Sequence, residues 1–242
     1  MTENNQSIKR YILAFDIEKS GATDKYPIIG IGASVVNQDF KELERLFLPG
    51  YFPGQTPFES RCWDEFWNTH QEQLNMLEYK GPKPMAERQV DMIKVFQYFR
   101  KKWEEKCKQY GTKLEIVSDN NVFDGGFINK MIHDHLPDTF PLPYSATRKQ
   151  EGTQMYQPFF ETFSQQRGLL LAVDPEYVLN NDWGYGDRIK ELYNVPEVPT
   201  HTNVLGQSVK VEHDHNPAND AYTIACDQQI LFKIASGEIT RK

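Results

Sequence analysis

Two acidic residues, Asp16 and Glu18, stand two positions apart at the end of the apolar stretch RYILAFDIE (10–18). If this stretch is a β-strand, both carboxylates project from one face while Ile17 points into the core. Adjacent carboxylates repel each other unless a cation lies between them, and a divalent cation with oxygen ligands is the natural partner. The pair therefore indicates a metal site, although D-x-E alone also fits a solvated strand end.

A third acidic candidate, Asp124, lies in SDNNVFDGGF (118–127), directly after the predicted buried strand LEIVS (114–118). Phe123 beside it can anchor in the core, and Asp119 in the same segment is a competing carboxylate. Asp124 also fits a helix cap, and the neighbouring asparagine and glycine pairs also fit a turn. The segment alone leaves these alternatives open.

A histidine and a fourth acidic candidate fall in VEHDHNPANDAYTIA (211–225). Asn216 and Pro217 predict the start of a helix here, because asparagine caps helices and proline is favoured in their first turn. Asp220 would then lie within the first two turns of that helix, with His215 on the preceding loop. We expect this arrangement to place a carboxylate and an imidazole over one metal site.

The other two residues of this stretch that could do chemistry, His213 and Asp214, lie further from the predicted helix. We expect them to be bystanders or to support the site from outside. A zinc site built on the His-x-His pair is the alternative. It would need a further ligand at His201, His133 or His135, none of which has a diagnostic spacing.

Hydrophobic periodicity predicts the elements that position these residues. The predicted strands are 10–18, 28–37, 42–49 and 114–118, and the first three form a meander. The predicted helices are 59–79, about 85–110, 123–136, and 217 to about 236, with short helices in PFFETFSQQ (158–166) and GYGDRIKELYN (184–194). Strands followed by helices in this order predict a mixed sheet flanked by helices.

Composition restricts the class of protein. With 39% hydrophobic and 13% aromatic residues, the 242-residue chain has enough apolar side chains for a packed core. The net charge of −7 argues against a protein that coats nucleic acid through bulk electrostatics, but not against an enzyme acting on a strand end. Three widely separated cysteines argue against a cysteine-based zinc site.

The sequence also bears on the compartment. Its apolar runs are much shorter than the roughly 18–20 residues of a membrane helix. The N-terminal MTENNQSIKR lacks the apolar core of a signal peptide. We therefore expect an intracellular protein, in the cytoplasm or a host-cell compartment, that is not secreted and has no membrane partner.

The order of these motifs resembles that in the DEDD superfamily of 3′–5′ exonucleases, histidine subgroup. The motifs are D-x-E at a strand end, N-x-x-F-D, and H-x-x-x-x-D ahead of a final helix. The tyrosine subgroup has tyrosine four residues before the last aspartate, where this sequence has Asn216. The sequence departs from the family in having DIEKSG where many members have D-T-E-T-T-G. The matching residues are Asp16 and Glu18, then Asn120 with Phe123 and Asp124, then His215 and Asp220.

The resemblance implies an α/β, ribonuclease H-like fold with a mixed five-stranded sheet, made of a three-strand meander plus two parallel strands, flanked by helices. It implies one exonuclease domain over residues 1–242 with an irregular insertion at about 137–210. The implied reaction is hydrolysis of terminal phosphodiesters of DNA or RNA to nucleoside 5′-monophosphates.

The resemblance also implies two divalent cations, Mg²⁺ or Mn²⁺, about 3.5–4 Å apart, which clamp the attacking and leaving oxygens. Asp16 would bridge both, Glu18 and Asp220 would lie on the nucleophile side, and Asp124 would reach the other cation. Neutral His215 would accept the proton of the attacking water.

The expected partner is the 3′ end of a nucleic acid, single-stranded DNA or RNA. Residues that could contact it are Asn120, the Lys19-Ser20-Gly21 turn, and the aromatic residues Trp63, Phe66 and Trp67, whose rings could stack on bases. For at least two of these three aromatic residues we prefer a place in the core. Two rival functions are a noncatalytic nucleic-acid or protein-binding module on the same fold, and a metal-dependent endonuclease or other phosphoesterase.

Overall fold

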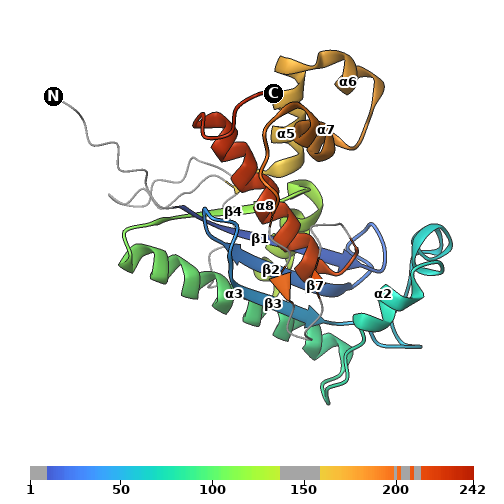
Figure 1. Ribbon diagram of the computed structural model, residues 1–242. Coiled ribbons are helices and arrows are strands. Elements are labelled where there is room, and N and C mark those ends of the chain that lie inside the picture. Colours follow the sequence, from blue (N-terminus) through green and yellow to red (C-terminus); the bar gives the residue numbers. More distant parts are fainter. Residues whose placement is uncertain (1–9, 137–158, 199–200, 203–207, 210–213) are drawn as a thin grey trace.

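The computed structural model describes residues 10–136, 159–198, 201–202, 208–209 and 214–242. A mixed β-sheet lies at its centre, with helices on both faces (Figure 1). The strand order is β3-β2-β1-β4-β5. The strands are β1 (Arg10–Lys19), β2 (Ile28–Val36), β3 (Glu42–Pro49), β4 (Lys113–Ser118) and β5 (Phe159–Glu161).

The first three strands form the predicted antiparallel meander, and β4 pairs parallel to β1. Four strands of six to ten residues form the body of the sheet, and the predicted count of five is reached only with the three-residue β5. β5 pairs parallel to β4 in a stretch where we predicted a helix. The helix begins instead at Thr162, because the two aromatic residues before it extend the sheet.

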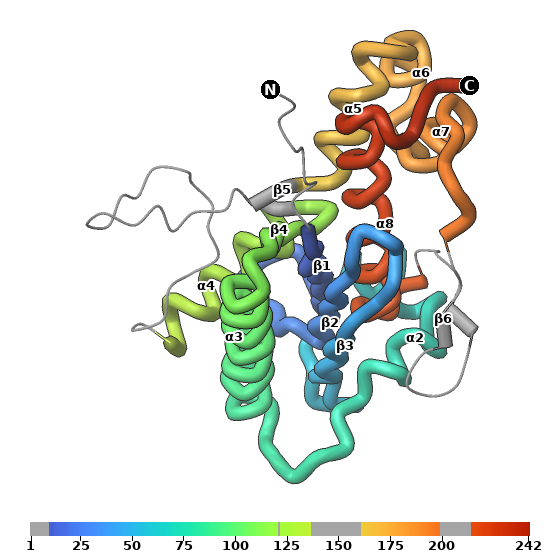
Figure 2. The backbone as a smooth tube through the Cα atoms, turned by 60° about the vertical axis from the view of Figure 1, so that its left-hand side comes forward, coloured from blue at the N-terminus to red at the C-terminus, as the bar shows by residue number. Residues whose placement is uncertain are grey.

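The two faces of the sheet carry separate cores, because alternate side chains of β1 point in opposite directions. Leu13, Phe15 and Ile17 face α3 (Met85–Gln109) and α4 (Gly126–His135). Ile12 and Ala14 face α8 (Pro217–Ala235). Figure 2 shows α3 and α8 on opposite sides of the strands. Asp16 and Glu18 continue the face that α8 covers.

Three helices of the predicted insertion are regular: the first packs against α8, and the other two pack against the first (Figure 1). They are α5 (Thr162–Val173), α6 (Pro175–Asn180) and α7 (Tyr185–Leu192). Thr162 donates to the side chain of Gln228 (3.1 Å), which joins α5 to the second half of α8. Residues 137–158 of the insertion lie outside the described residues.

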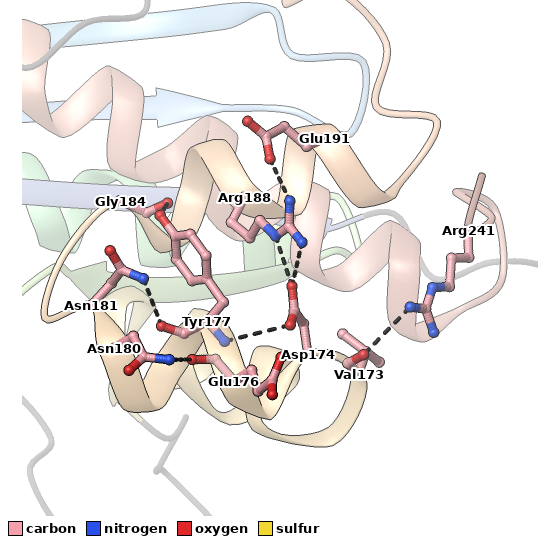
Figure 3. A network of polar contacts seen from close by, with 10 residues as sticks. All are labelled: Val173, Asp174, Glu176, Tyr177, Asn180, Asn181, Gly184, Arg188, Glu191 and Arg241. Carbon is pink, nitrogen blue, oxygen red and sulfur yellow. Dashed lines mark hydrogen bonds and ion pairs between the residues drawn. The ribbon is translucent and has the colours of Figure 1, made fainter.

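A polar network centred on Arg188 joins the helices of this region (Figure 3). Its guanidinium binds the Asp174 carboxylate through Nε (2.7 Å) and Nη2 (2.6 Å), and Nη1 lies 2.7 Å from Glu191. Asp174 in turn caps α6 by accepting from Tyr177 N (3.4 Å). These contacts hold α6 and α7 together.

The helix predicted over 59–79 is wrong as a single element. The structure has α1 (Ser60–Cys62), a π-helical turn η1 (Trp63–Trp67) and α2 (Gln71–Met76). Asn68 N donates to Trp63 O (2.9 Å), which widens the turn. The widened turn buries Trp67, whose indole nitrogen donates to Lys19 O (2.9 Å). Tertiary packing thus overrides the helical periodicity.

Two long helices match their predictions closely: α3 ends one residue before the predicted Tyr110, and α8 begins at the predicted Pro217. A further pair of two-residue strands, β6 (His201–Thr202) and β7 (Ser208–Val209), is antiparallel. Within the described ranges, no helix combines the length and apolar character needed to cross a membrane.

Candidate metal centre

The glycines of β2 make room for the site. Gly32 is the register partner of Asp16, and Gly30 is the partner of Glu18. A Cβ atom at Gly32 would lie 2.0 Å from Pro217 C, inside the first turn of α8. The absence of a side chain therefore lets α8 approach the sheet beside Asp16. Sequence analysis missed this role, although two glycines two positions apart in a buried strand indicate a close backbone approach.

The first turn of α8 presents Asp220, which is fully buried. Asn216 caps the helix as predicted, accepting from Ala218 N (3.1 Å) and Asn219 N (3.4 Å). The backbone nitrogen of Asp214 donates to Asp220 Oδ1 (3.0 Å). The loop before α8 is thereby fixed to the carboxylate that the helix carries.

Asp214 is more than a bystander. Its Oδ1 accepts from Asn216 N (3.0 Å) and its Oδ2 accepts from Asn219 Nδ2 (2.8 Å). Asn219 Oδ1 accepts in turn from Arg45 of β3, which also binds Glu42 (2.9 Å). This chain of contacts ties the His215 loop to the sheet. His213 lies outside the described residues.

His215 sits on this loop with a positive φ of 60°, which is uncommon for a residue with a side chain. Its Nδ1 lies 3.7 Å from Glu18 Oε1. The ring meets Phe66 edge-on (centroids 4.6 Å apart) and His70 edge-on (5.3 Å), while Phe66 and His70 stack on each other (4.3 Å). These two rings form one wall of the site.

Sequence analysis did not identify His70 as part of the site. The only signal was its position four residues after Phe66, which would place both on one face of a helix. Phe66, a candidate for base stacking, lies directly against His215.

Asp124 and its competitor Asp119 both lie at the site. Ligand atoms of Asp16, Asp119 and Asp124 are within 4.8 Å of one another, and a second such group is Glu18, His215 and Asp220. Asn120 shapes the turn between β4 and the π-helical turn η2 (Asn121–Gly125): its backbone oxygen accepts from Asp124 N (2.8 Å), and its Oδ1 accepts from Phe123 N (3.1 Å).

The carboxylates repel one another in a largely dry environment. Burial raises the pKa of Asp16 well above its ordinary value, and the charges of neighbouring carboxylates, Asp124 first, raise it further. Burial also raises the pKa of Glu18 to about 8 and that of Asp220 to about 9. For Asp124, burial raises the pKa first and the Asp119 charge second. The site thus favours cations or protons between its oxygens.

The donor set fits a hard divalent cation. The Oδ2 atoms of Asp16 and Asp124 are buried, and neither has a hydrogen-bond partner among the described residues. Carboxylate oxygens are ligands suited to Mg²⁺ or Mn²⁺. Burial lowers the pKa of His215, with Asp214 acting in the opposite direction, so the imidazole favours its neutral form.

The predicted substrate-contacting turn is tightly anchored. Lys19 Nζ lies 3.8 Å from the centre of the Phe127 ring and donates to Tyr26 O. Burial lowers the pKa of this lysine to about 8. Ser20 is fully buried, and a Cβ atom at Gly21 would lie 2.5 Å from the Tyr26 ring.

The aromatic residues of η1 differ in their surroundings. Trp67 is 1% exposed and belongs to the core, as we preferred. Trp63 is partly buried beside it, with its ring edge-on to Phe58 (5.0 Å between centroids). Phe66 packs on the same cluster, and its ring also contacts His215.

No family model matches the chain, and no curated protein matches it. Some solved nuclease structures resemble it weakly. Exonuclease I from Methylocaldum szegediense is 12% identical with a TM-score of 0.48, over 94% of this chain and 43% of that chain. Cell-death related nuclease 4 is 10% identical with a TM-score of 0.48, over 96% of this chain and 66% of that chain.

A complex of E. coli exonuclease I with single-stranded DNA is 13% identical with a TM-score of 0.47, over 95% of this chain and 41% of that chain. The chain therefore spans less than half the length of these exonuclease I chains. Because all three TM-scores are below 0.5, the functional proposal rests on the geometry of the site.

Proposed function

We propose that the protein is a metal-dependent 3′–5′ exonuclease with a ribonuclease H-like fold, which releases nucleoside 5′-monophosphates from DNA or RNA. One observation carries the proposal: Asp16 lies with one group of possible cation ligands, and its strand neighbour Glu18 lies with the other. Two adjoining ligand groups at one strand end suit two cations. Single-stranded DNA or RNA is the substrate that we propose.

Each residue has a role in this proposal. Glu18 and Asp220 would hold one cation on the side of His215, Asp124 would hold the other, and Asp16 would contribute to both. Two divalent cations, Mg²⁺ or Mn²⁺, would when bound supply the Lewis acidity that activates water and neutralises charge on the phosphate. His215, kept neutral by burial, accepts the proton of the attacking water.

The hydrogen bonds of the His215 loop support this role. A general base must be held in a fixed orientation, since small misplacements are costly in rate. Asp214 fixes the loop to α8. Its backbone nitrogen donates to Asp220, and its carboxylate accepts from Asn216 N and Asn219 Nδ2. Phe66 and His70 restrict the imidazole from the other side.

The test is a time course on 5′-labelled linear single-stranded DNA and RNA, and on circular single-stranded DNA, with Mg²⁺, Mn²⁺ or EDTA. We expect ladders that shorten from the 3′ end of the linear strands, intact circles, and no reaction in EDTA. A bulky 3′ block should suppress the reaction. Cleavage of circles at the rate of linear strands would instead establish an endonuclease.

Variants link the activity to the site. Replacing Asp16, Glu18, Asp124 or Asp220 by alanine should each abolish hydrolysis without unfolding the protein, because each removes a cation ligand and relieves repulsion. Circular dichroism checks the fold. Full activity in a correctly folded Asp16→Ala variant would reject the proposal.

A further inference from the structure

Asp119 is the acidic residue of the site that the D-x-E, F-D and H-x-x-x-x-D motifs do not include. It follows the last residue of β4, one position before the asparagine that shapes the η2 turn. Ligand atoms of Asp119, Asp16 and Asp124 lie within 4.8 Å of one another. Asp119 is therefore close enough to share a cation with both.

The other two members of this group point to a ligand. Asp16 is 6% exposed and Asp124 is 2% exposed. Each has a buried Oδ2 atom with no hydrogen-bond partner among the described residues. Burying such an oxygen without a partner costs free energy. A hydrogen-bond donor or a cation bound to these two atoms would remove that cost. The half-buried Asp119 lies beside them. It adds a third carboxylate to the group and brings no positive charge.

Charge count favours a cation here. The other ligand group includes a histidine, whose Nδ1 lies 3.7 Å from Glu18 Oε1. The group of Asp16, Asp119 and Asp124 consists of carboxylates alone. In oxygen-ligand sites, more negative ligands give tighter binding of divalent cations.

We propose that Asp119 is a fifth carboxylate of the metal centre, which completes with Asp16 and Asp124 a divalent-cation site that fills before nucleic acid binds. The inference deepens the proposed function and rests on its metal-dependent site. It assigns Asp119 as a direct ligand, not as a residue that only orients Asp124.

The test is a titration of the nucleic-acid-free protein with Mn²⁺. Binding is measured by calorimetry and by the electron paramagnetic resonance signal of free Mn²⁺. Wild type should bind two Mn²⁺ ions. Asp119→Asn, which keeps the shape but removes the charge, should weaken one of them by about tenfold or more while the other is unchanged. Asp220→Asn should weaken the other one.

The matched control is Asp187→Asn. Asp187 has an 85% exposed side chain on α7, and its substitution changes the net charge by the same amount. It should leave both Mn²⁺ affinities as in wild type. Circular dichroism shows before any titration whether Asp119→Asn is folded. If it is not, Asp119→Ser is the second variant.

An unchanged titration in folded Asp119→Asn or Asp119→Ser, with loss of one ion in Asp124→Asn, would overturn the inference. Equal weakening in Asp187→Asn would also overturn it, because a bulk charge effect would then explain the change. Failure of the proposed function is separate: Asp119-dependent binding of two ions without strand cleavage would keep this inference and reject the exonuclease. Strand cleavage by a protein whose Mn²⁺ binding does not depend on Asp119 would keep the exonuclease and reject this inference.

Discussion

Gly32 lies directly across the β1–β2 pair from Asp16, and the backbone of Pro217 occupies the space that a side chain at Gly32 would need. Because Gly32 has no side chain, the Asp16 carboxylate on β1 and the start of α8, about 200 residues later in the sequence, can lie side by side. The relationship explains how Asp220 reaches the end of β1.

Gly32→Ala should therefore push α8 away from the sheet. A Cβ atom there would be 2.0 Å from Pro217 C and 2.1 Å from Ala218 N, and backbone cannot move aside locally. We expect a loss of about 1–3 kcal/mol in the free energy of unfolding, as for other overpacked sites, and a large loss of hydrolysis. Urea denaturation and the strand time course measure the two effects.

The control for this variant is Gly168→Ala in α5, where a new Cβ atom would meet nothing within 4 Å. It should be neutral or slightly stabilising, because alanine is a better helix former than glycine. Equal stability of the Gly32 and Gly168 variants would contradict the role assigned to Gly32.

Stability of the metal-free protein should fall as pH rises. Burial raises the folded-state pKa of Glu18 to about 8 and of Asp220 to about 9, well above their ordinary values near 4. The folded state therefore binds these protons more tightly, and the associated stability is full below pH 4 and lost as pH rises through about 8–9. Melting temperatures in EDTA from pH 5 to 9 should decrease.

Two additions sharpen this pH experiment. Asp220→Asn should flatten the decrease, because the amide does not titrate. Saturating Mg²⁺ should raise the melting temperature most at high pH, where the carboxylates are ionised and able to bind it. A metal-free melting temperature that increases from pH 6 to 9 would show that the carboxylates do not retain protons in the folded state.

His215→Ala should lower the single-turnover rate by about 10²–10⁴-fold, the usual contribution of a general base. Burial lowers the pKa of His215, so the wild-type rate should rise with pH at values below those of an ordinary histidine and then level off. Single-turnover rates from pH 5 to 9 measure this rise, which the variant should lack.

His213→Ala is the comparison; His213 precedes His215 by two residues in the sequence and lies outside the described residues. It should lose little activity. If His213→Ala were inactive and His215→Ala active, the assignment of the base would be reversed.

Asn219→Ala should loosen the His215 loop without removing a cation ligand. Asn219 joins Asp214 on the loop to Arg45 on β3. Its loss should reduce the chemical rate on the order of 10–100-fold through misplacement of the base, while Mn²⁺ affinity stays near wild type. Asn180→Ala, on the exposed side of α6, should keep the wild-type rate. A wild-type rate in Asn219→Ala would show that the loop holds its place without this contact.

Local patterns in the sequence determined the parts of this protein that depend on neighbouring residues. Strand alternation is enough to place Asp16 and Glu18 on one face, opposite Ile17. A capping asparagine followed by proline is enough to start α8, because the cap acts on backbone groups within three residues. These elements are found where the sequence predicts them.

Only the tertiary structure decided what depends on residues far apart in the chain. The break of 59–79 into three pieces depends on the hydrogen bond of Trp67 to Lys19, 48 residues earlier. The meeting of Asp119 and Asp124 with Asp16, and of Phe66 and His70 with His215, depends on how β4, η1 and α8 converge on β1. Periodicity reports which face of an element is buried, but the partner of that face is chosen by packing across the whole sheet.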